Sequence, residues 1–188
     1  SNWRSNYSSS QCERNARISS NLQNISRHLK LVIEMRQKGL KMTFINELTT
    51  AIEMLEKQSY PWSDSSKLDQ IKTLIQQNSA GLRNRKSPLH LSASAIVFKN
   101  EQAIFIRHPY LHTILLPAGH VEPGELPVEC AIREFHEETG GTVIPNTGKL
   151  IDLNMIDIPA NPLKNEGKHQ HIDFRYTFKQ AGIKADNA

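Results

Sequence analysis

Residues 126–139 are the most sharply patterned segment of this chain, because they combine an apolar face and an acidic face at helical spacing. The apolar residues recur at intervals of three and four, which predicts one buried face of a helix: Val128, Ala131, Ile132 and Phe135. Pro127 suits the first helical turn, where a missing N–H costs nothing. Gly140 suits the left-handed position that follows a last turn. The segment therefore predicts one amphipathic helix with defined ends.

The acidic residues of this helix, Glu134, Glu137 and Glu138, lie at i, i+3 and i+4 on a neighbouring face. Three carboxylates this close repel one another unless a cation lies between them. Hard oxygen ligands select Mg²⁺, Mn²⁺ or Ca²⁺ over softer metals. A solvated acidic face would show the same pattern. The glycine-containing loop before the helix, and an adjoining Arg133 that can orient Glu134, favour a metal site.

Segment 119–141 resembles the signature of the Nudix hydrolase superfamily, Gly-x5-Glu-x7-Arg-Glu-U-x-Glu-Glu-x-Gly-U, in which U is bulky and usually aliphatic. All charged positions of the signature match at the correct spacing, together with its two glycines: Gly119, Glu125, Arg133, Glu134, Glu137, Glu138 and Gly140. Phe135 is aromatic where an aliphatic residue is usual, and Gly141 is small where a bulky one is usual. Both departures concern packing, so they bear on local stability more than on chemistry.

The resemblance implies the Nudix α/β/α sandwich with a mixed sheet, here preceded by an N-terminal helical region like the leaders of some bacterial, MutT-like members. The implied activity is hydrolysis of a nucleoside diphosphate linked to another group, by water attack on phosphorus with Mg²⁺ or Mn²⁺ as cofactor. The identity of the other group stays open, as does the alternative of a Nudix-fold module that binds a ligand or RNA without catalysis.

The resemblance also implies roles for residues of this segment. The implied catalytic residues are Glu125, Arg133, Glu134, Glu137 and Glu138. The implied metal ligands are Glu134, Glu137, Glu138 and the backbone carbonyl of Ala118. Arg133 would orient Glu134, and Glu125 would support the junction of loop and helix or an outer metal shell. The general base stays open between one of these glutamates and Glu166, in a polar loop.

A second polar cluster lies near the C-terminus. In a strand, side chains repeat every two residues, which places His169, His171, Asp173 and Arg175 on one face. Such a face could supply a base or bind substrate phosphate, although an exposed edge strand would have the same pattern. A zinc site at His169 and His171 is disfavoured because no third ligand is evident. Arg107 is a further candidate for substrate binding, with a solvated hairpin tip as its alternative.

The remaining pattern divides the chain into three regions. Residues 1–16 are rich in Ser and Asn and predict a disordered tail. Residues 17–86 predict a helical N-terminal region, with apolar stripes over 18–39, 43–55 and 68–75. Residues 87–188 form the predicted Nudix domain. The sequence leaves open whether this domain is truncated at its C-terminal end. Its expected strands cover 91–98, 103–107, 113–116, 149–158 and 170–178.

The charge distribution and the composition limit the classes of partner that this chain is expected to bind. Residues 1–88 contain 14 Lys and Arg against 7 Asp and Glu, whereas residues 89–188 contain 9 against 12. The basic half could attract nucleic acid, but no aromatic residues interleave with it, which favours a solvated helical surface. The chain has only two cysteines and no apolar run near the roughly 20 residues that span a bilayer. We therefore expect a cytoplasmic protein with a nucleotide-type small-molecule substrate and no membrane partner. A sheet face left bare would favour a homodimer.

Overall fold

A computed structural model describes residues 43–107, 113–160 and 167–181, and the structural statements below concern these ranges. The tail predicted over 1–16, the helix predicted over 18–39 and the candidate base Glu166 lie outside the described residues. The chain divides into two compact units after Lys57. The predicted boundaries at residues 16 and 86 stay predictions.

Helix α2 (Phe44–Gln58) lies almost wholly in the first unit. The hydroxyl of Thr43 accepts a hydrogen bond from the backbone N–H of Asn46 at 3.3 Å, as an N-cap residue should. The buried side chains of the helix recur every three or four residues: Leu48, Ile52 and Leu55. The sequence prediction of an amphipathic helix in this region is therefore confirmed.

Helix α3 (Ser65–Gln77) belongs to the second unit and is fastened to the sheet of that unit. Asp64 caps the helix by accepting two backbone N–H bonds. Just before the cap, the indole N–H of Trp62 donates to the carbonyl of Ile151 at 2.9 Å. Within α3, Lys67 forms an ion pair with Asp152 at 3.3 Å. The helix predicted from the apolar stripe over 68–75 is thus present, and polar contacts link it and the preceding Trp62 to a strand far along the chain.

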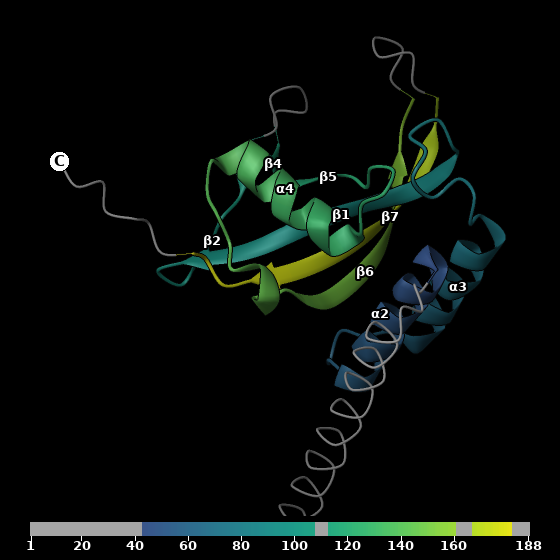
Figure 1. Ribbon diagram of the computed structural model, residues 1–188, viewed down its shortest axis with the longest axis horizontal. Coiled ribbons are helices and arrows are strands. Elements are labelled where there is room, and N and C mark those ends of the chain that lie inside the picture. The colour runs from purple at the N-terminus through teal and green to yellow at the C-terminus, as the bar shows by residue number, and fades with distance from the viewer. Residues whose placement is uncertain (1–42, 108–112, 161–166, 182–188) are drawn as a thin grey trace, which may run out of the picture. The chain divides into compact units, whose positions relative to one another are not determined.

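The second unit is built on a mixed five-stranded sheet with the order β2-β1-β7-β6, in which β5 also pairs with β1 (Figure 1). Strand β1 runs parallel to β7 and antiparallel to β2 and β5, whereas β6 and β7 are antiparallel. The strands are β1 (Leu89–Lys99), β2 (Gln102–Ala103), β5 (Ala118–His120), β6 (Lys149–Ile158) and β7 (His169–Phe178). The predicted mixed α/β architecture with preceding helices is confirmed.

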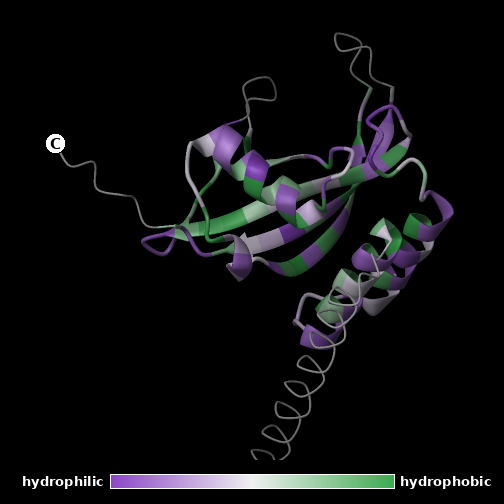
Figure 2. Ribbon diagram, in the orientation of Figure 1, coloured by the Kyte–Doolittle hydropathy of each residue, from purple (hydrophilic) through white to green (hydrophobic). Residues whose placement is uncertain are grey.

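Helix α4 (Pro127–Thr139) crosses this sheet and contacts β1, β5 and β7 (Figure 1). Hydrophilic and hydrophobic stretches alternate along α4 (Figure 2), as an amphipathic helix requires. Its core face contains Cys130, Ala131 and Phe135, each at most 1% exposed. Gly140 ends the helix in the left-handed conformation, with φ of 69°. The ends predicted for this helix are correct to within one residue.

The two departures from the Nudix signature compensate each other in the core. Phe135 is buried, and its ring lies against Gly141. A Cβ atom on residue 141 would lie 2.9 Å from the ring atom Cε1 of Phe135. The aromatic side chain therefore occupies space that a bulky residue at position 141 would need.

The prediction of one strand over 103–107 is wrong. Asn100 and Glu101 both have positive φ, 50° and 64°, which gives the two-residue turn that suits a twisted hairpin. Strand β2 is then only two residues long. The chain next enters a separate two-stranded ribbon, in which β3 (Ile106–Arg107) pairs with β4 (Ile114–Leu115). The apolar run continues across this break, so periodicity cannot detect that the pairing partner changes.

The sequence analysis also missed β5 and a 3₁₀ turn over Pro145–Thr147. Strand β5 contains Ala, Gly and His, which have no alternation of apolar residues; its pairing with β1 makes it a strand. Within the described residues, no helix has the length and apolar character that a membrane span requires.

Candidate active site

Arg133 is the centre of a network that joins α4 to the loop before it. Its Nε donates to Glu125 Oε1 at 2.8 Å, and its Nη1 donates to Glu134 Oε1 at 2.6 Å and to Glu137 Oε2 at 3.2 Å. Its Nη2 donates to Glu125 Oε2 and to the carbonyl of His120, both at 3.0 Å. One planar guanidinium thus fixes three carboxylates and the end of β5.

The carboxylate of Glu125 stabilises this network by accepting two hydrogen bonds from Arg133. Burial by itself would raise the pKa of Glu125, but hydrogen bonds from Arg133 and from the backbone N–H of Glu122 lower it below its ordinary value. The hydrogen bond with Glu125 in turn raises the pKa of Arg133. Both groups therefore stay charged at neutral pH.

The pKa of Glu138 is shifted in the opposite direction from that of Glu125. Its Oε2 accepts a hydrogen bond from the backbone N–H of Ala118 at 3.0 Å. Burial, and then the negative charges of Glu134 and Glu137, raise the pKa of Glu138 above its ordinary value. A nearby cation would relieve this repulsion. The three carboxylates are thus a donor set that fits a hard divalent cation such as Mg²⁺ or Mn²⁺.

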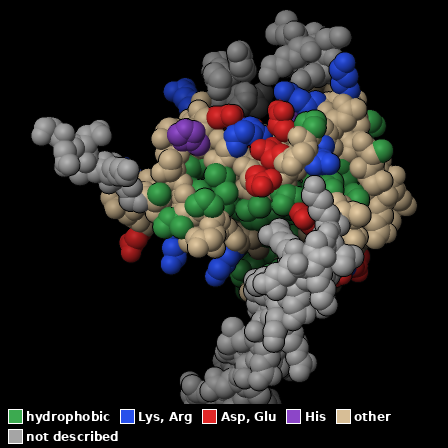
Figure 3. Space-filling model, viewed as in Figure 1, with side chains coloured by type: hydrophobic (Ala, Val, Ile, Leu, Met, Phe, Trp, Pro, Cys, Tyr) green, Lys and Arg blue, Asp and Glu red, His purple; other side chains and the backbone are tan. Residues whose placement is uncertain are grey.

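Gly119 is the position at which the backbone of β5 approaches the acidic face most closely. A Cβ atom on this residue would overlap the carboxylate of Glu134. Glycine is therefore required by the close approach, and no positive φ is involved. This contact brings β5 and the acidic face of α4 together at one edge of the sheet. Acidic and basic side chains gather over α4 in the space-filling view (Figure 3).

The second set of polar side chains lies on strands β7 and β1 of the sheet. Asp173 on β7 is 2% exposed and accepts hydrogen bonds from the hydroxyls of Ser92 at 2.9 Å and Ser94 at 2.7 Å. Arg175 forms an ion pair with Asp173 at 3.6 Å and donates to the Ser94 hydroxyl at 3.4 Å. Burial raises the pKa of Asp173, although the hydroxyls and Arg175 oppose the rise. Because β7 lies between β1 and β6, the alternative of an exposed edge strand is wrong.

A cavity of about 800 Å³ lies between the acidic helix face and the polar face of the sheet. Six of the residues predicted from the sequence line it: Ala118, Glu134, Glu138, His171, Asp173 and Arg175. Arg107 and His169 are not among its lining residues. Arg107 lies in the separate β3–β4 ribbon, and Glu137 has a more exposed side chain at the outer end of the Arg133 network. The structure thus brings the two predicted polar groups together around one space.

Sequence reasoning missed Ser92, Ser94 and His90. The signal was present, because these three polar residues alternate with buried apolar ones along β1. It also missed that His90 and His120 meet His169 and His171 in one cluster. The expectation that the two strand histidines lack a third metal ligand is therefore wrong.

Comparison with known proteins shows which family the chain resembles. The model of the NUDIX domain family matches residues 88–186. A probable DHNTP pyrophosphohydrolase of Lactococcus lactis subsp. cremoris (strain MG1363) is 55% identical over 114 residues, which are 60% of this chain and 68% of that protein.

Two solved structures are also similar. A NUDIX hydrolase from Nitrosomonas europaea is 22% identical with a TM-score of 0.37, and the match covers 51% of this chain and 62% of that one. The dihydroneopterin triphosphate pyrophosphohydrolase of E. coli is 18% identical with a TM-score of 0.40, over 52% and 73% of the two chains. Because the family model covers more than half of the chain and the Lactococcus relative shares more than half of the aligned residues, the chain belongs to the Nudix hydrolase family.

Proposed function

We propose that this chain is a divalent-metal-dependent pyrophosphohydrolase that cleaves a phosphoanhydride bond in a small triphosphate ester, with dihydroneopterin triphosphate (DHNTP) as the first candidate substrate. The observation that carries the proposal is the shared cavity. Glu134 and Glu138 of the Nudix signature (residues 119–141, the box) face the same space as Asp173 and Arg175 of the sheet. The name of the Lactococcus relative supports the choice of substrate.

The carboxylates of Glu134, Glu137 and Glu138 would hold the cation, with the backbone carbonyl of Ala118 as a further ligand. When bound, the cation would neutralise phosphate charge and make the attacking water more acidic. Glu134 and Glu138 line the cavity, which supports one of them as the acceptor of the proton of that water.

Arg133 and Glu125 would act as positioning residues. The guanidinium of Arg133 donates to Glu134 and Glu137 at the distances given above, so it sets where the two carboxylates lie. Glu125 holds the guanidinium through two hydrogen bonds at 2.8 and 3.0 Å. Both residues would thereby favour one arrangement of the ligands before substrate arrives.

The cavity offers contacts for both ends of such a substrate, the phosphate chain and the ring. Arg175 supplies a fixed positive charge for a phosphate, since Asp173 and Ser94 restrain its side chain. Around the same cavity lie apolar side chains that remain exposed: Phe105 at 53%, Ile114 at 69% and Ile156 at 37%. Exposed apolar side chains beside a polar cavity suit a flat heteroaromatic ring such as a pterin or a nucleobase.

The proposal is tested by measuring pyrophosphate and phosphate release with Mg²⁺ or Mn²⁺. The panel contains DHNTP, nucleoside triphosphates, ADP-ribose, and RNA with a 5′-triphosphate or a cap. We expect the highest kcat/KM with DHNTP and pyrophosphate as product. If the enzyme preferred RNA, DHNTP would be wrong as the substrate, but the proposed hydrolase activity would stand. If the folded protein turned over nothing on the panel, the non-catalytic alternative would be favoured.

Gly119→Ala should reduce kcat/KM about 100-fold, because the new methyl group must displace the Glu134 carboxylate from its contact with Arg133. Steady-state kinetics on the preferred substrate measure the loss. Gly167→Ala is the matched control, since a Cβ atom there meets nothing within 4 Å. Equal activity of the two variants would contradict the positioning of Glu134 by this close approach.

A further inference from the structure

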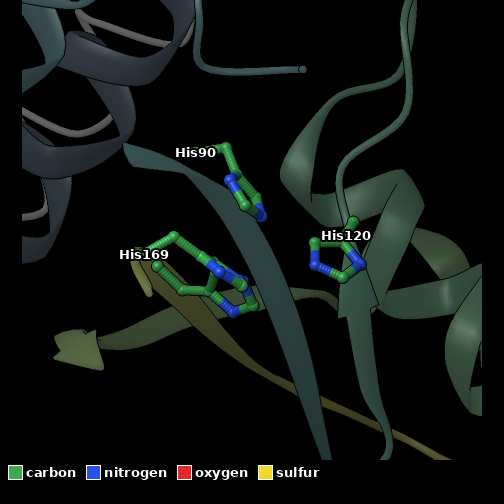
Figure 4. A group of neighbouring side chains, drawn as sticks. His90, His120 and His169 are labelled. Carbon is green, nitrogen blue, oxygen red and sulfur yellow. The ribbon is translucent and has the colours of Figure 1, made fainter. Parts of the chain in front are cut away.

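Four histidine side chains from three strands converge at one end of the sheet (Figure 4). His90 comes from β1, His120 from β5, and His169 and His171 from β7. One potential ligand nitrogen from each lies within 4.8 Å of those of the others. We propose that this histidine cluster binds one zinc-like transition-metal ion, at a site separate from the box carboxylates.

Strand register produces the convergence. In the parallel pair of β1 and β7, His90 lies directly opposite His171. In the antiparallel pair of β1 and β5, His120 lies opposite Ser92, one position along the same face of β1. His169 shares a face with His171, because the two lie two positions apart on β7. The four imidazoles are therefore held by the backbone of the sheet itself.

The spacing of the rings is close to that of a tetrahedral site. His169 Nε2 and His171 Nε2 are 3.1 Å apart. Ring centroids of the contacting pairs lie 4.5 to 5.0 Å apart. Zinc–nitrogen bonds of about 2.0–2.1 Å in a tetrahedron put the nitrogens about 3.3 Å apart. Since no pair exceeds 4.8 Å, inward movements of about 1 Å or less complete the site.

Two of the rings are oriented as metal ligands usually are. Nδ1 of His90 lies 2.9 Å from the carbonyl of Ser87, and Nδ1 of His169 lies 2.8 Å from the carbonyl of Gly167. A carbonyl can only accept, so each Nδ1 carries the proton and, in the neutral ring, Nε2 presents its lone pair to the cluster.

The ligand chemistry separates this cluster from the acidic helix face. Imidazole nitrogen suits Zn²⁺, Co²⁺, Ni²⁺ and Cu²⁺, whereas carboxylate oxygen suits Mg²⁺ and Mn²⁺. A metal in the histidine cluster would clamp β1, β5 and β7 together. His120 directly follows Gly119, and its carbonyl accepts a hydrogen bond from Arg133. The clamp would therefore also fix the strand on which the box network rests.

Cobalt binding tests the site without reference to hydrolysis. The full chain is purified without a polyhistidine tag, stripped of metal and titrated with Co²⁺ in excess Mg²⁺. We expect about one Co²⁺ per chain, with the visible absorption of tetrahedral cobalt, displaced by Zn²⁺. Zn²⁺ at a hundredfold excess over its Kd should also raise Tm by about 5–10 °C. No tightly bound Co²⁺, or only the weak spectrum of octahedral cobalt, would overturn the proposal.

Variants locate the bound ion. His169→Gln and His171→Gln should each weaken Co²⁺ binding at least about 100-fold. His136→Gln on α4 is the matched control and should bind as the original chain does. Glu138→Gln should also bind unchanged. Binding that survives in the strand variants but is lost in Glu138→Gln would place the ion in the box and contradict the cluster.

Loss of binding in a strand variant counts only if circular dichroism shows it folded. X-ray absorption of the zinc-loaded original chain decides the same question independently. A shell of four imidazole nitrogens at about 2.0 Å supports the cluster, whereas a shell of oxygen or sulfur ligands refutes it.

Discussion

Glu138→Gln should lower kcat/KM about 1000-fold and leave the folded chain at least as stable as the original. The amide oxygen of Gln can still accept the hydrogen bond from the backbone N–H of Ala118, so the local structure is kept. Only the negative charge is lost, and with it several kcal/mol of cation and transition-state stabilisation. Removing a like charge next to Glu134 and Glu137 should raise the free energy of unfolding by a few tenths of a kcal/mol.

The experiment compares kinetics and urea unfolding of this variant with Glu129→Gln. Glu129 lies on the same helix and accepts a hydrogen bond from the backbone N–H of Leu126 at 2.8 Å, which Gln can also do. We expect Glu129→Gln to keep full activity. A loss of activity in Glu138→Gln that was matched by a loss of stability would argue against a role in holding the cation.

Phe135→Ala should reduce the free energy of unfolding by about 3–5 kcal/mol. Phe135 is 1% exposed and is among the largest fully buried side chains of the described core. Its loss would leave a cavity between α4 and the sheet, and the neighbouring Gly141 has no side chain to fill it. Denaturant unfolding measures the effect, and the corresponding fall in Tm is about 10 °C.

Phe98→Ala is the control for loss of a phenyl ring, because Phe98 is 54% exposed at the end of β1. We expect it to cost less than about 1 kcal/mol. Similar losses for the two variants would mean that the packing of α4 on the sheet contributes little to stability.

The local pattern of the sequence was sufficient for the helices and the long strands of the described residues. The alternation of intervals of three and four residues predicted α4. Ala131 and Phe135 are buried as expected, whereas Val128 and Ile132 are only half-buried and Cys130 lies in the core. The ends of β6 were predicted correctly and those of β7 to within one residue. Helical spacing also places Arg133 next to Glu137, four positions on, but it does not account for the contacts of Arg133 with Glu134 and with Glu125 in the preceding loop.

Strand pairing was decided by the tertiary structure. Ser92 and Asp173 are 81 residues apart in the chain and form a buried hydrogen bond. Nothing near either residue indicates the other, since parallel pairing of β1 with β7 depends on the whole sheet. The same register brings four scattered histidines into one cluster, creates β5 from a segment without strand pattern, and separates β3 from β2.

The chain by itself therefore determined its family signature, its helix faces and the chemistry of each candidate residue, because these depend on residues a few positions apart. Only the tertiary structure decided which groups share a cavity. The physical reason is that strand register, which is set by the packing of the whole sheet, brings together residues that no local period connects.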